Sequence, residues 1–507
     1  MEMTADIVIV GGGHNGLTAA AYLAQAGRSV LLLERDDHVG GAAVSATAFA
    51  GVDARLSRYS YLVSLLPARI INELGLNIEL ARRRYSSYTP DPADPSHGLL
   101  VDSGDPDATR ASFERIGAGG DVGAWVELGT DLARLAQALF PTVCEPLPSR
   151  SEARRLLGDD ELWAELIERP LGDLLTRRFG NDLVRGVVAT DGLIGTFTSV
   201  DDPSLDANRC FLYHVIGNAT GDWDVPIGGM GAVTGELYRA ARNAGAEIVT
   251  NAEVLSISPG GDVVYDGGTV HGDFVLANVA PYVLSRLLDE HPPAKPEGAQ
   301  VKVNLLLSRL PRLKDETVDP VAAFGGTFHI NETWTQLGDA YDRAASGAIP
   351  TPLPAEIYCH SLADPSILSL DLQQAGAQTL TVFGLHSPSR LTATTAELEA
   401  AVLASLNSVL AEPVESLLLT DANGAPTIET KTTSDIEAAL GMPGGNIFHG
   451  PLSWPFAEDS DRMSTPAEQW GVATAHPRIL LCGSGSQRGG AVSGLGGHNA
   501  AMAVLGS

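Results

Sequence analysis

Residues 5–41 read ADIVIVGGGHNGLTAAAYLAQAGRSVLLLERDDHVGG, and this stretch decides the fold. It opens with a short apolar run, Ala5 to Val10, of the kind that forms a buried strand of a parallel sheet. A helical pattern follows from Leu17 to Ala26 and stops at Gly27, the residue type that most often ends a helix. The apolar run Ser29 to Leu33 predicts a second strand. Strand, helix and strand in this order form the unit that opens a dinucleotide-binding sheet.

The turn between the first strand and the helix carries the glycine pattern G-x-G-x-x-G. Gly11 allows a tight turn, Gly13 lets a pyrophosphate approach the backbone, and Gly16 allows close packing of helix on strand. Unpaired N–H groups at the N-terminus of the helix then meet the phosphates, and Asn15 in this turn is also expected to contribute to cofactor binding. We expect His14 to occupy the phosphate side of the turn rather than to act as a base.

A carboxylate and a second pair of glycines complete the motif. Glu34 ends the second strand and is followed by Arg35; a carboxylate there accepts hydrogen bonds from both ribose hydroxyls and disfavours the phosphate of NADP. Gly40 and Gly41 predict another close approach to phosphate. The combined pattern therefore predicts a bound dinucleotide.

The choice between FAD and NAD depends on the far end of the chain. An apolar run from Ile479 leads into a glycine-rich loop and a helix that starts near Gly497. Such an ending is typical of flavoproteins with a split nucleotide domain, whose loop N–H groups stabilise negative charge on the reduced flavin. A glycine turn without a ligand is the alternative. We expect FAD, held here by Gly483, Ser484, Gly490, Ala491 and Val492.

A second G-x-G-x-x-G pattern for NAD(P)H does not occur between residues 100 and 440. The turn Gly228-Gly229-Met230-Gly231 has another spacing and follows no apolar strand. The flavin is therefore expected to take hydride from an organic substrate and to pass electrons to oxygen, a quinone or another acceptor.

The middle of the chain mixes helices and strands. Residues 90–95, Pro-Asp-Pro-Ala-Asp-Pro, predict a loop, because each proline disfavours helical geometry in its predecessor. Apolar residues between Trp125 and Leu139 recur every three or four positions and predict an amphipathic helix. Strand-like runs at 301–307 and 379–385 accompany a helical pattern at 396–410.

These patterns predict an α/β protein with a split Rossmann-like FAD-binding domain and an inserted mixed α+β substrate domain. A chain of 507 residues is long enough for two such units. We assign residues 1–75, 225–296 and 436–507 to the FAD-binding domain. Residues 76–224 and 297–435 are assigned to the substrate domain.

Composition excludes several classes of function. The net charge of −29 repels phosphate backbones, so no nucleic-acid partner is expected. No apolar run has the length of a transmembrane segment and no secretory signal opens the chain, which predicts a cytoplasmic protein. No metal site is predicted, because the cysteines lie too far apart for a C-x-x-C motif. The oligomeric state stays open, a homo-oligomer included.

Several segments resemble a known group of flavoproteins. Gly11 to Gly41, Pro226 to Gly231 and Cys482 to Gly485 are similar to phytoene desaturase relatives in the amine oxidase and protoporphyrinogen oxidase superfamily. Residues 57–66 and 444–450 are most similar to the phytoene-dehydrogenase-like branch labelled pyridine nucleotide-disulfide oxidoreductase domain-containing protein 2. The resemblance implies an FAD-dependent dehydrogenase, desaturase or oxidase that acts on a fairly apolar small molecule.

The resemblance also implies roles for single residues. Val254 would lie against the adenine, and Asn278 would border the same end of the nucleotide. Lys302 would match the amine oxidase lysine that holds a water at flavin N5; a solvated strand face is the alternative. His449, in a glycine-flanked turn, is a candidate base near neutral pH or else a histidine that caps backbone groups. Tyr61 is a candidate for the substrate pocket, followed by His360 and His386.

Two other functions stay open. One is a redox-neutral isomerase that works through reduced flavin, as carotenoid isomerases of this superfamily do. The other is a non-catalytic carrier like the prenyl-protein binding members, against which the intact Glu34 and Gly40-Gly41 count.

Overall fold

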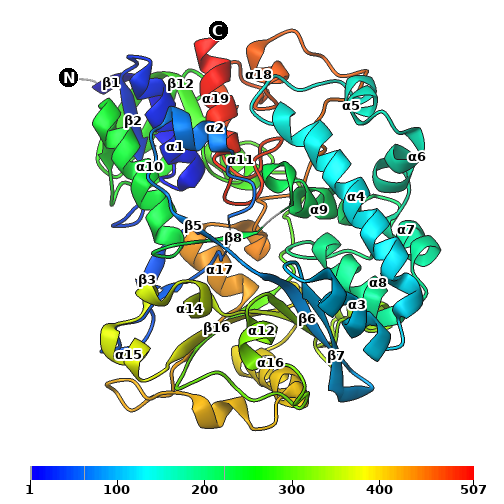
Figure 1. Cartoon of the computed structure of the whole chain (residues 1–507). Helices are drawn as coiled ribbons and strands as arrows, with labels where there is room; N and C mark the ends of the chain where they lie inside the picture. Colours follow the sequence, from blue (N-terminus) through cyan, green and yellow to red (C-terminus); the bar gives the residue numbers. More distant parts are fainter. Residues whose placement is uncertain (1–2, 62, 222) are drawn as a thin grey trace.

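Two large sheets and a layer of helices make up the computed structural model, which describes residues 3–61, 63–221 and 223–507 (Figure 1). The first sheet carries the glycine-rich turn, and both ends of the described chain lie beside it. The second sheet lies below it in Figure 1, and the helical layer flanks both.

The first sheet is built around the N-terminal strand, which pairs in parallel with a neighbour on each side. Its strands follow the spatial order β10 (Val254–Ile257), β11 (Asp262–Tyr265), β12 (Gly268–Ala277), β1 (Met3–Val10), β2 (Val30–Leu33) and β9 (Glu247–Val249), with β18 (Ile479–Leu481) paired to β12.

Successive side chains of β1 point to opposite faces of this sheet, and each face packs against its own apolar core. Ile7 and Ile9 share a core with the helices α1 (His14–Gln25), α10 (Met230–Ala244) and α19 (Leu495–Leu505). Val8 and Val10 lie in a separate core on the opposite face. The first and last of these helices also pack against each other (Figure 1).

The second sheet is antiparallel except where β14 meets β6. Its strands follow the order β17 (Ile428–Lys431), β13 (Val301–Leu307), β16 (Gln378–Gly384), β15 (Ala355–Tyr358), β14 (Thr327–Ile330), β6 (Tyr85–Asp91) and β7 (Asp94–Asp102). Val301 and Val303 face an apolar core closed by α16 (Thr395–Val409), so Lys302 between them faces the other way.

The predicted loop at residues 90–95 is confirmed only at Pro92-Ala93, which form a turn, whereas its flanking residues belong to strands. The segment forms the hairpin of β6 and β7, in which Pro90 pairs with Gly98. Pro95 is tolerated because β7 is the edge strand, where a missing N–H leaves no partner unsatisfied. Pro90 lies beyond the residues of β6 that pair with β14.

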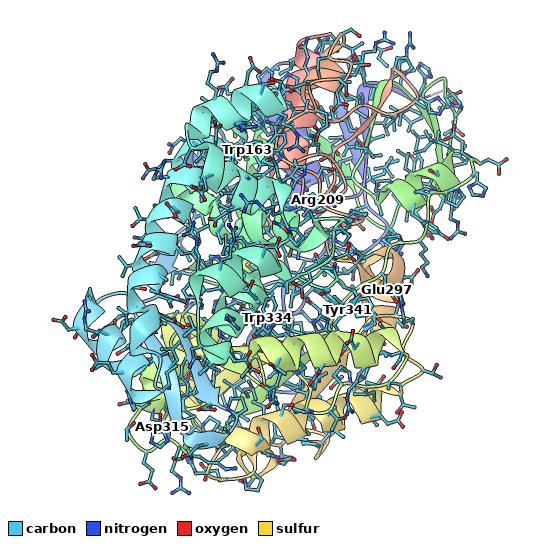
Figure 2. All side chains as sticks on the ribbon, turned by 90° about the vertical axis from the view of Figure 1, so that its right-hand side faces the viewer. Trp163, Arg209, Glu297, Asp315, Trp334 and Tyr341 are labelled. Carbon is cyan, nitrogen blue, oxygen red and sulfur yellow. The ribbon has the colours of Figure 1, made fainter. Side chains whose placement is uncertain are left out.

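The helical layer connects β7 to β8 (Asp224–Pro226). Figure 2 shows Trp334, the first residue of α13 (Trp334–Ala345), where this helix packs against the layer. The layer consists of α3 (Pro106–Arg115), α4 (Val122–Leu139), α5 (Arg150–Leu157), α6 (Asp160–Trp163), α7 (Leu171–Arg178), α8 (Asp182–Ala189) and α9 (Asp206–Val215).

Shorter elements complete the fold. They are β3 (Ser45–Thr47), β4 (Arg55–Ser57), β5 (Leu80–Arg82), α2 (Ala68–Glu73), α11 (Pro281–Leu287), α12 (Pro320–Phe324), α14 (His360–Ala363), α15 (Leu370–Gln374), α17 (Thr433–Leu440) and α18 (Pro466–Gln469). The predicted α/β class is confirmed, whereas the exact domain limits stay a prediction. Within the described residues, no helix combines the length and apolar character needed to cross a membrane.

Candidate functional site

The glycine-rich turn joins β1 to α1 with almost no side-chain bulk. Gly11 has a φ of +102°, and a Cβ atom there would lie 2.8 Å from the carbonyl oxygen of Asn278. At Gly16 a Cβ atom would lie 2.2 Å from the carbonyl oxygen of Gly11, so only glycine fits. Gly13 precedes α1, and no side chain caps the first N–H groups of the helix. An anion placed here would meet donors without a side-chain partner.

Glu34 follows β2 and is held rigidly. Its Oε2 accepts a hydrogen bond from the N–H of Gly12 at 2.6 Å, and its Oε1 accepts one from the N–H of Asp36 at 2.9 Å. Each oxygen keeps a lone pair for a ligand hydroxyl. Asn278, after β12, closes the turn by donating from Nδ2 to the carbonyl oxygen of Gly11 at 2.9 Å.

A cavity of about 250 Å³ runs along this turn, and we call it the nucleotide cavity. Eight of the predicted cofactor-binding residues line it: Gly11, Gly13, Glu34, Arg35, Gly41, Val254, Asn278 and Ser484. Asn15, Gly16, Gly40, Gly483 and Gly490 line neither this cavity nor its neighbour. These residues lie where backbone segments approach one another closely. The N–H of Gly40, for example, donates to the carbonyl oxygen of Gly12 at 2.9 Å.

The loop after β18 brings the end of the chain onto the start of α1. His14 Nε2 lies 3.0 Å from the carbonyl oxygen of Ala491, and Asn15 Nδ2 donates to the carbonyl oxygen of Gly489 at 3.5 Å. Burial lowers the pKa of His14 to about 4, so its ring is neutral at physiological pH. The start and the end of the described chain therefore build this site together.

A second cavity, of about 180 Å³, adjoins the nucleotide cavity, and we call it the apolar cavity. The two share His14, Ala42, Leu440, Met442 and Ser484. The remaining lining is mostly aromatic and aliphatic and includes Tyr61, Tyr213, Trp223, Phe383, Ile447, Phe448, Ala491 and Val492. The two cavities therefore lie on either side of these shared residues.

Lys302 lines the apolar cavity and is 1% exposed, so the alternative of a solvated strand face is wrong. Its Nζ donates to the carbonyl oxygen of Ser57 at 2.8 Å and lies 5.1 Å from the ring centre of Phe383. Burial lowers the pKa of Lys302 to about 7, and the nearby Glu429 works in the opposite direction. The predicted water-holding role of Lys302 stays a prediction.

Glu356 brings a carboxyl group to the same cavity. In register, Lys302 on β13 pairs with Phe383 on β16, which pairs with Glu356 on β15, and all three line the cavity. The carboxylate accepts a hydrogen bond from Thr190 Oγ1 and another from the Tyr358 hydroxyl, both at 2.8 Å. Burial raises the pKa of Glu356 to about 7.

Tyr61 lines the apolar cavity, as its predicted role requires. Its ring lies 4.5 Å from the ring of Tyr358 and 5.4 Å from that of His360, and burial raises its pKa. His360 and His386 line neither of the two cavities. His386 packs between Phe197 and Tyr341 instead.

His449 lies on the nucleotide cavity and not on the apolar cavity. Burial and the neighbouring His14 lower its pKa to about 4, which contradicts the expectation of a base that titrates near neutral pH. Its Nδ1 is buried without a hydrogen-bond partner among the described residues. A ligand in the nucleotide cavity would therefore meet a neutral imidazole nitrogen at this point.

Comparison with known proteins agrees with this geometry. Residues 9–69 match the family model of an NAD(P)-binding Rossmann-like domain. The chain is 56% identical to the uncharacterised protein Rv0897c of Mycobacterium tuberculosis, over 99% of this chain and 97% of that protein. It is 28% identical to pyridine nucleotide-disulfide oxidoreductase domain-containing protein 2 of Rattus norvegicus, over 99% and 93%. A variant of putrescine oxidase redesigned in its cofactor binding has the same fold, with a TM-score of 0.59 at 17% identity over 100% of both chains.

The chain belongs to the same family as the Mycobacterium tuberculosis protein Rv0897c. The resemblance inferred from the sequence is confirmed by the similarity to pyridine nucleotide-disulfide oxidoreductase domain-containing protein 2 and by the Rossmann-like match, and the fold is shared with putrescine oxidase. Within this fold, the first sheet carries the nucleotide cavity and the second sheet contributes Lys302 to the apolar cavity.

Sequence reasoning missed part of the apolar cavity. Glu356, Tyr358 and Phe383 lie between residues 310 and 435, where the resemblance is weakest. The signal that could have found them is the alternation Ala355-Glu356-Ile357-Tyr358, which predicts a strand with one polar face.

Proposed function

We propose that this protein binds FAD and uses it to remove hydride from a largely apolar small organic molecule. The electrons then pass to oxygen, a quinone or another acceptor. The observation that carries the proposal is that the nucleotide cavity and the apolar cavity adjoin, because they share five lining residues. A dinucleotide held along the glycine-rich turn would extend its reactive end toward Lys302 and Glu356.

The residues of the nucleotide cavity fit FAD. The uncapped start of α1 suits a pyrophosphate, and the fixed carboxylate of Glu34 suits ribose hydroxyls. Ser484, Ala491 and Val492 lie where the nucleotide cavity opens into the apolar one, so this loop would border the flavin end.

The lining of the apolar cavity defines the class of substrate. Aromatic and aliphatic side chains dominate, and they gain most from contact with an apolar molecule. Lys302 and Glu356 add a few polar atoms that can orient a substrate. We therefore propose a small molecule that is mainly apolar and carries at most a few polar groups.

FAD, when bound, supplies the acceptor for a hydride equivalent. The side chains of Tyr61, Trp223 and Phe448 exclude water from the substrate. Lys302 places a positive charge at the cavity wall when it is protonated, and Glu356 offers a carboxyl group that can hold or accept a proton. Reaction at an activated carbon then depends mainly on alignment.

Anaerobic reduction tests this proposal. The purified protein should retain FAD, identified after release by denaturation, and candidate substrates should bleach its absorbance without oxygen. Isomerisation of a substrate with no net bleaching would support the isomerase alternative instead. A colourless protein that takes up no added FAD contradicts the proposal altogether.

A further inference from the structure

Three buried side chains with metal-binding atoms converge on the second sheet. His329 lies on β14, Glu332 follows that strand, and Glu356 lies on β15. One ligand-capable atom from each residue lies within 4.8 Å of those of the other two. Their exposed fractions are 4%, 0% and 1%, so this is no surface cluster of acids.

Strand register and a turn bring these side chains together. His329 and Glu356 are direct partners in the antiparallel pair of β14 and β15, which places their side chains side by side on one face. Asn331 has a φ of +57°, and its Nδ2 donates to the carbonyl oxygen of Leu353 at 3.2 Å. This turn directs Glu332 back toward the pair.

Some ligand atoms of the cluster receive no hydrogen bond from the residues around them. His329 Nδ1 lies 3.0 Å from Thr89 Oγ1, which leaves Nε2 as the other ring nitrogen for a ligand. Glu356 accepts hydrogen bonds from Thr190 and Tyr358. Neither carboxylate oxygen of Glu332 has a hydrogen-bond partner among the described residues. A buried polar group without a partner is costly, so these two oxygens have capacity for a further ligand.

The charges nearby point the same way. Asp191 adds a third carboxyl group to those of Glu332 and Glu356, and Arg83 is a cation that acts on Asp191 and Glu356. The carboxyl groups thus outnumber this neighbouring guanidinium.

We propose that His329, Glu332 and Glu356 bind a divalent first-row transition metal ion. One imidazole and two carboxylates form a ligand set that such ions accept, and Thr89, Thr190 and Tyr358 supply the outer hydrogen bonds that orient the ligands. His329 also lines a separate cavity of about 310 Å³.

A bound ion would fix the wall of the apolar cavity. Glu356 belongs both to the cluster and to the lining of that cavity, so the ion would hold its carboxylate in one position beside the substrate. The inference does not depend on the proposed oxidation chemistry, because metal uptake is measured without substrate turnover; with an ion bound, Glu356 would orient the substrate rather than hold a proton.

Zinc binding to the FAD-loaded full chain tests the site. After treatment with a chelator, the wild type should take up one Zn²⁺ per chain in isothermal titration calorimetry and retain it through gel filtration. Glu332→Gln and Glu356→Gln should each remove this binding. Asp94→Asn is the matched control: Asp94 and His97 form an exposed histidine–carboxylate pair, and its loss should leave the tight site intact.

A variant outside the ligand set covers the case in which the glutamine variants do not fold. Thr89→Val removes the partner of His329 Nδ1, and zinc affinity should then fall about 10- to 100-fold. No zinc uptake by the wild type, or uptake that Glu332→Gln leaves unchanged, would overturn the site. FAD content and anaerobic reduction are measured on the same samples, so failure of the metal site is distinguishable from failure of the proposed oxidation.

Discussion

At the scale of single residues, the environment of Lys302 has consequences that can be measured. The pKa of Lys302 is lowered to about 7 in the folded chain, against 10.5 for an ordinary lysine. Between these values the unfolded chain binds more protons than the folded one, so the free energy of unfolding rises with pH across this window. Below pH 7 Lys302 is protonated in both states, and the cost of burying its charge lowers the free energy of unfolding in full.

Lys302→Met should remove this part of the pH dependence. Denaturant unfolding at pH 7 and at pH 9.5 should show a smaller rise in stability for the variant than for the wild type. Lys431→Met is the control, because Lys431 is the register partner of Lys302 on β17 but its side chain is 21% exposed. Equal pH dependence in all three proteins would show that Lys302 is not the titrating group.

The same substitution should slow reoxidation of the reduced flavin by oxygen. In the proposed role, a protonated Lys302 would favour the negative charge that develops at the flavin during this step. We therefore expect the reoxidation rate of Lys302→Met to be about ten-fold lower or more. In the wild type the rate should fall as pH rises through about 7, because the ammonium form is lost. Stopped-flow mixing of reduced protein with oxygen measures both effects; a rate unchanged in Lys302→Met contradicts the assignment.

Glu34 gives a separate prediction for cofactor affinity. Glu34→Ala would remove the carboxylate proposed to accept hydrogen bonds from two ribose hydroxyls, and it should weaken FAD binding by about 1–3 kcal/mol. Turnover at saturating FAD should change little. The neighbouring Asp37 has an 82% exposed side chain, so Asp37→Ala is the control. A large loss of turnover with unchanged FAD affinity would move Glu34 from binding to chemistry.

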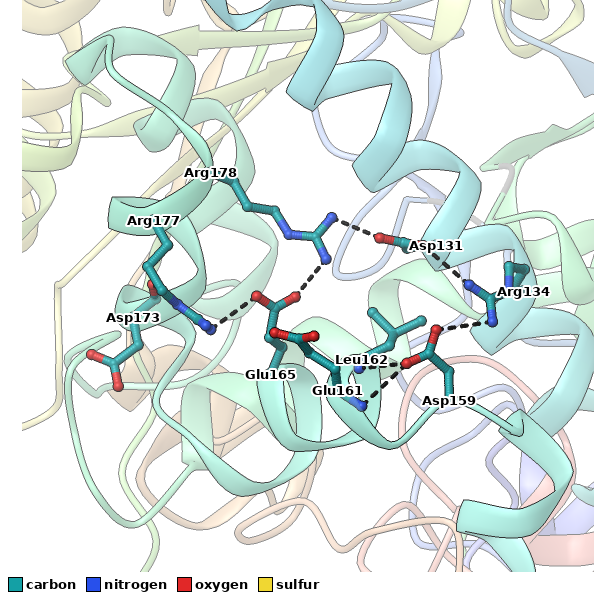
Figure 3. A network of polar contacts seen from close by, with 9 residues as sticks. All are labelled: Asp131, Arg134, Asp159, Glu161, Leu162, Glu165, Asp173, Arg177 and Arg178. Atoms are coloured by element: carbon teal, nitrogen blue, oxygen red, sulfur yellow. Dashed lines mark hydrogen bonds and ion pairs between the residues drawn. The ribbon is translucent and has the colours of Figure 1, made fainter.

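At the scale of elements, a network of ion pairs holds the helical layer together (Figure 3). Glu165, which is 6% exposed, contacts Arg177 at 2.9 Å and Arg178 at 2.5 Å, and Arg178 also reaches Asp131 at 2.7 Å. The network thereby ties α7 to α4 and to the turn that contains Glu165. These arginines are partners of internal acids and leave little charge for an external anion.

Glu165→Gln should therefore destabilise this layer. We expect the free energy of unfolding to fall by about 1–3 kcal/mol, since two arginines lose a charged partner and Arg177 is partly screened by solvent. Glu161→Gln, at an exposed position in the same stretch, should change it by less than about 0.5 kcal/mol. Denaturant titration measures the free energy of unfolding of both variants. Equal losses would mean that the network does not stabilise the fold.

Elements with a strong periodic pattern could be predicted from the sequence. The helix at 396–410 and the strands at 301–307 and 379–385 are confirmed to within one residue. The hairpin at 85–102 could not be predicted in this way. Proline is tolerated in it because β7 lies at the edge of the sheet, and that position is a property of the tertiary fold. Glu356 was missed for a similar reason: its neighbours Phe383 and Lys302 come from other strands.

At the scale of the whole molecule, the nucleotide cavity joins segments that are distant in the chain. FAD at 100 times its dissociation constant should raise the free energy of unfolding by about 2.7 kcal/mol. Thermal unfolding at increasing FAD measures this, and NADP at the same concentrations should give little shift because of Glu34. An FAD-independent melting temperature would contradict binding at this cavity.

The pairing of the start and the end of the chain also matters during synthesis. His14 and Ala491, whose contact closes the site, are 477 residues apart. At roughly 5–20 residues per second, a ribosome needs roughly 25–95 s to make the chain between them. During that time α1, which is buried along almost its whole length in the folded protein, lacks α19 as its cover. The nascent chain is therefore expected to need protection by chaperones until the ribosome has delivered the closing helix.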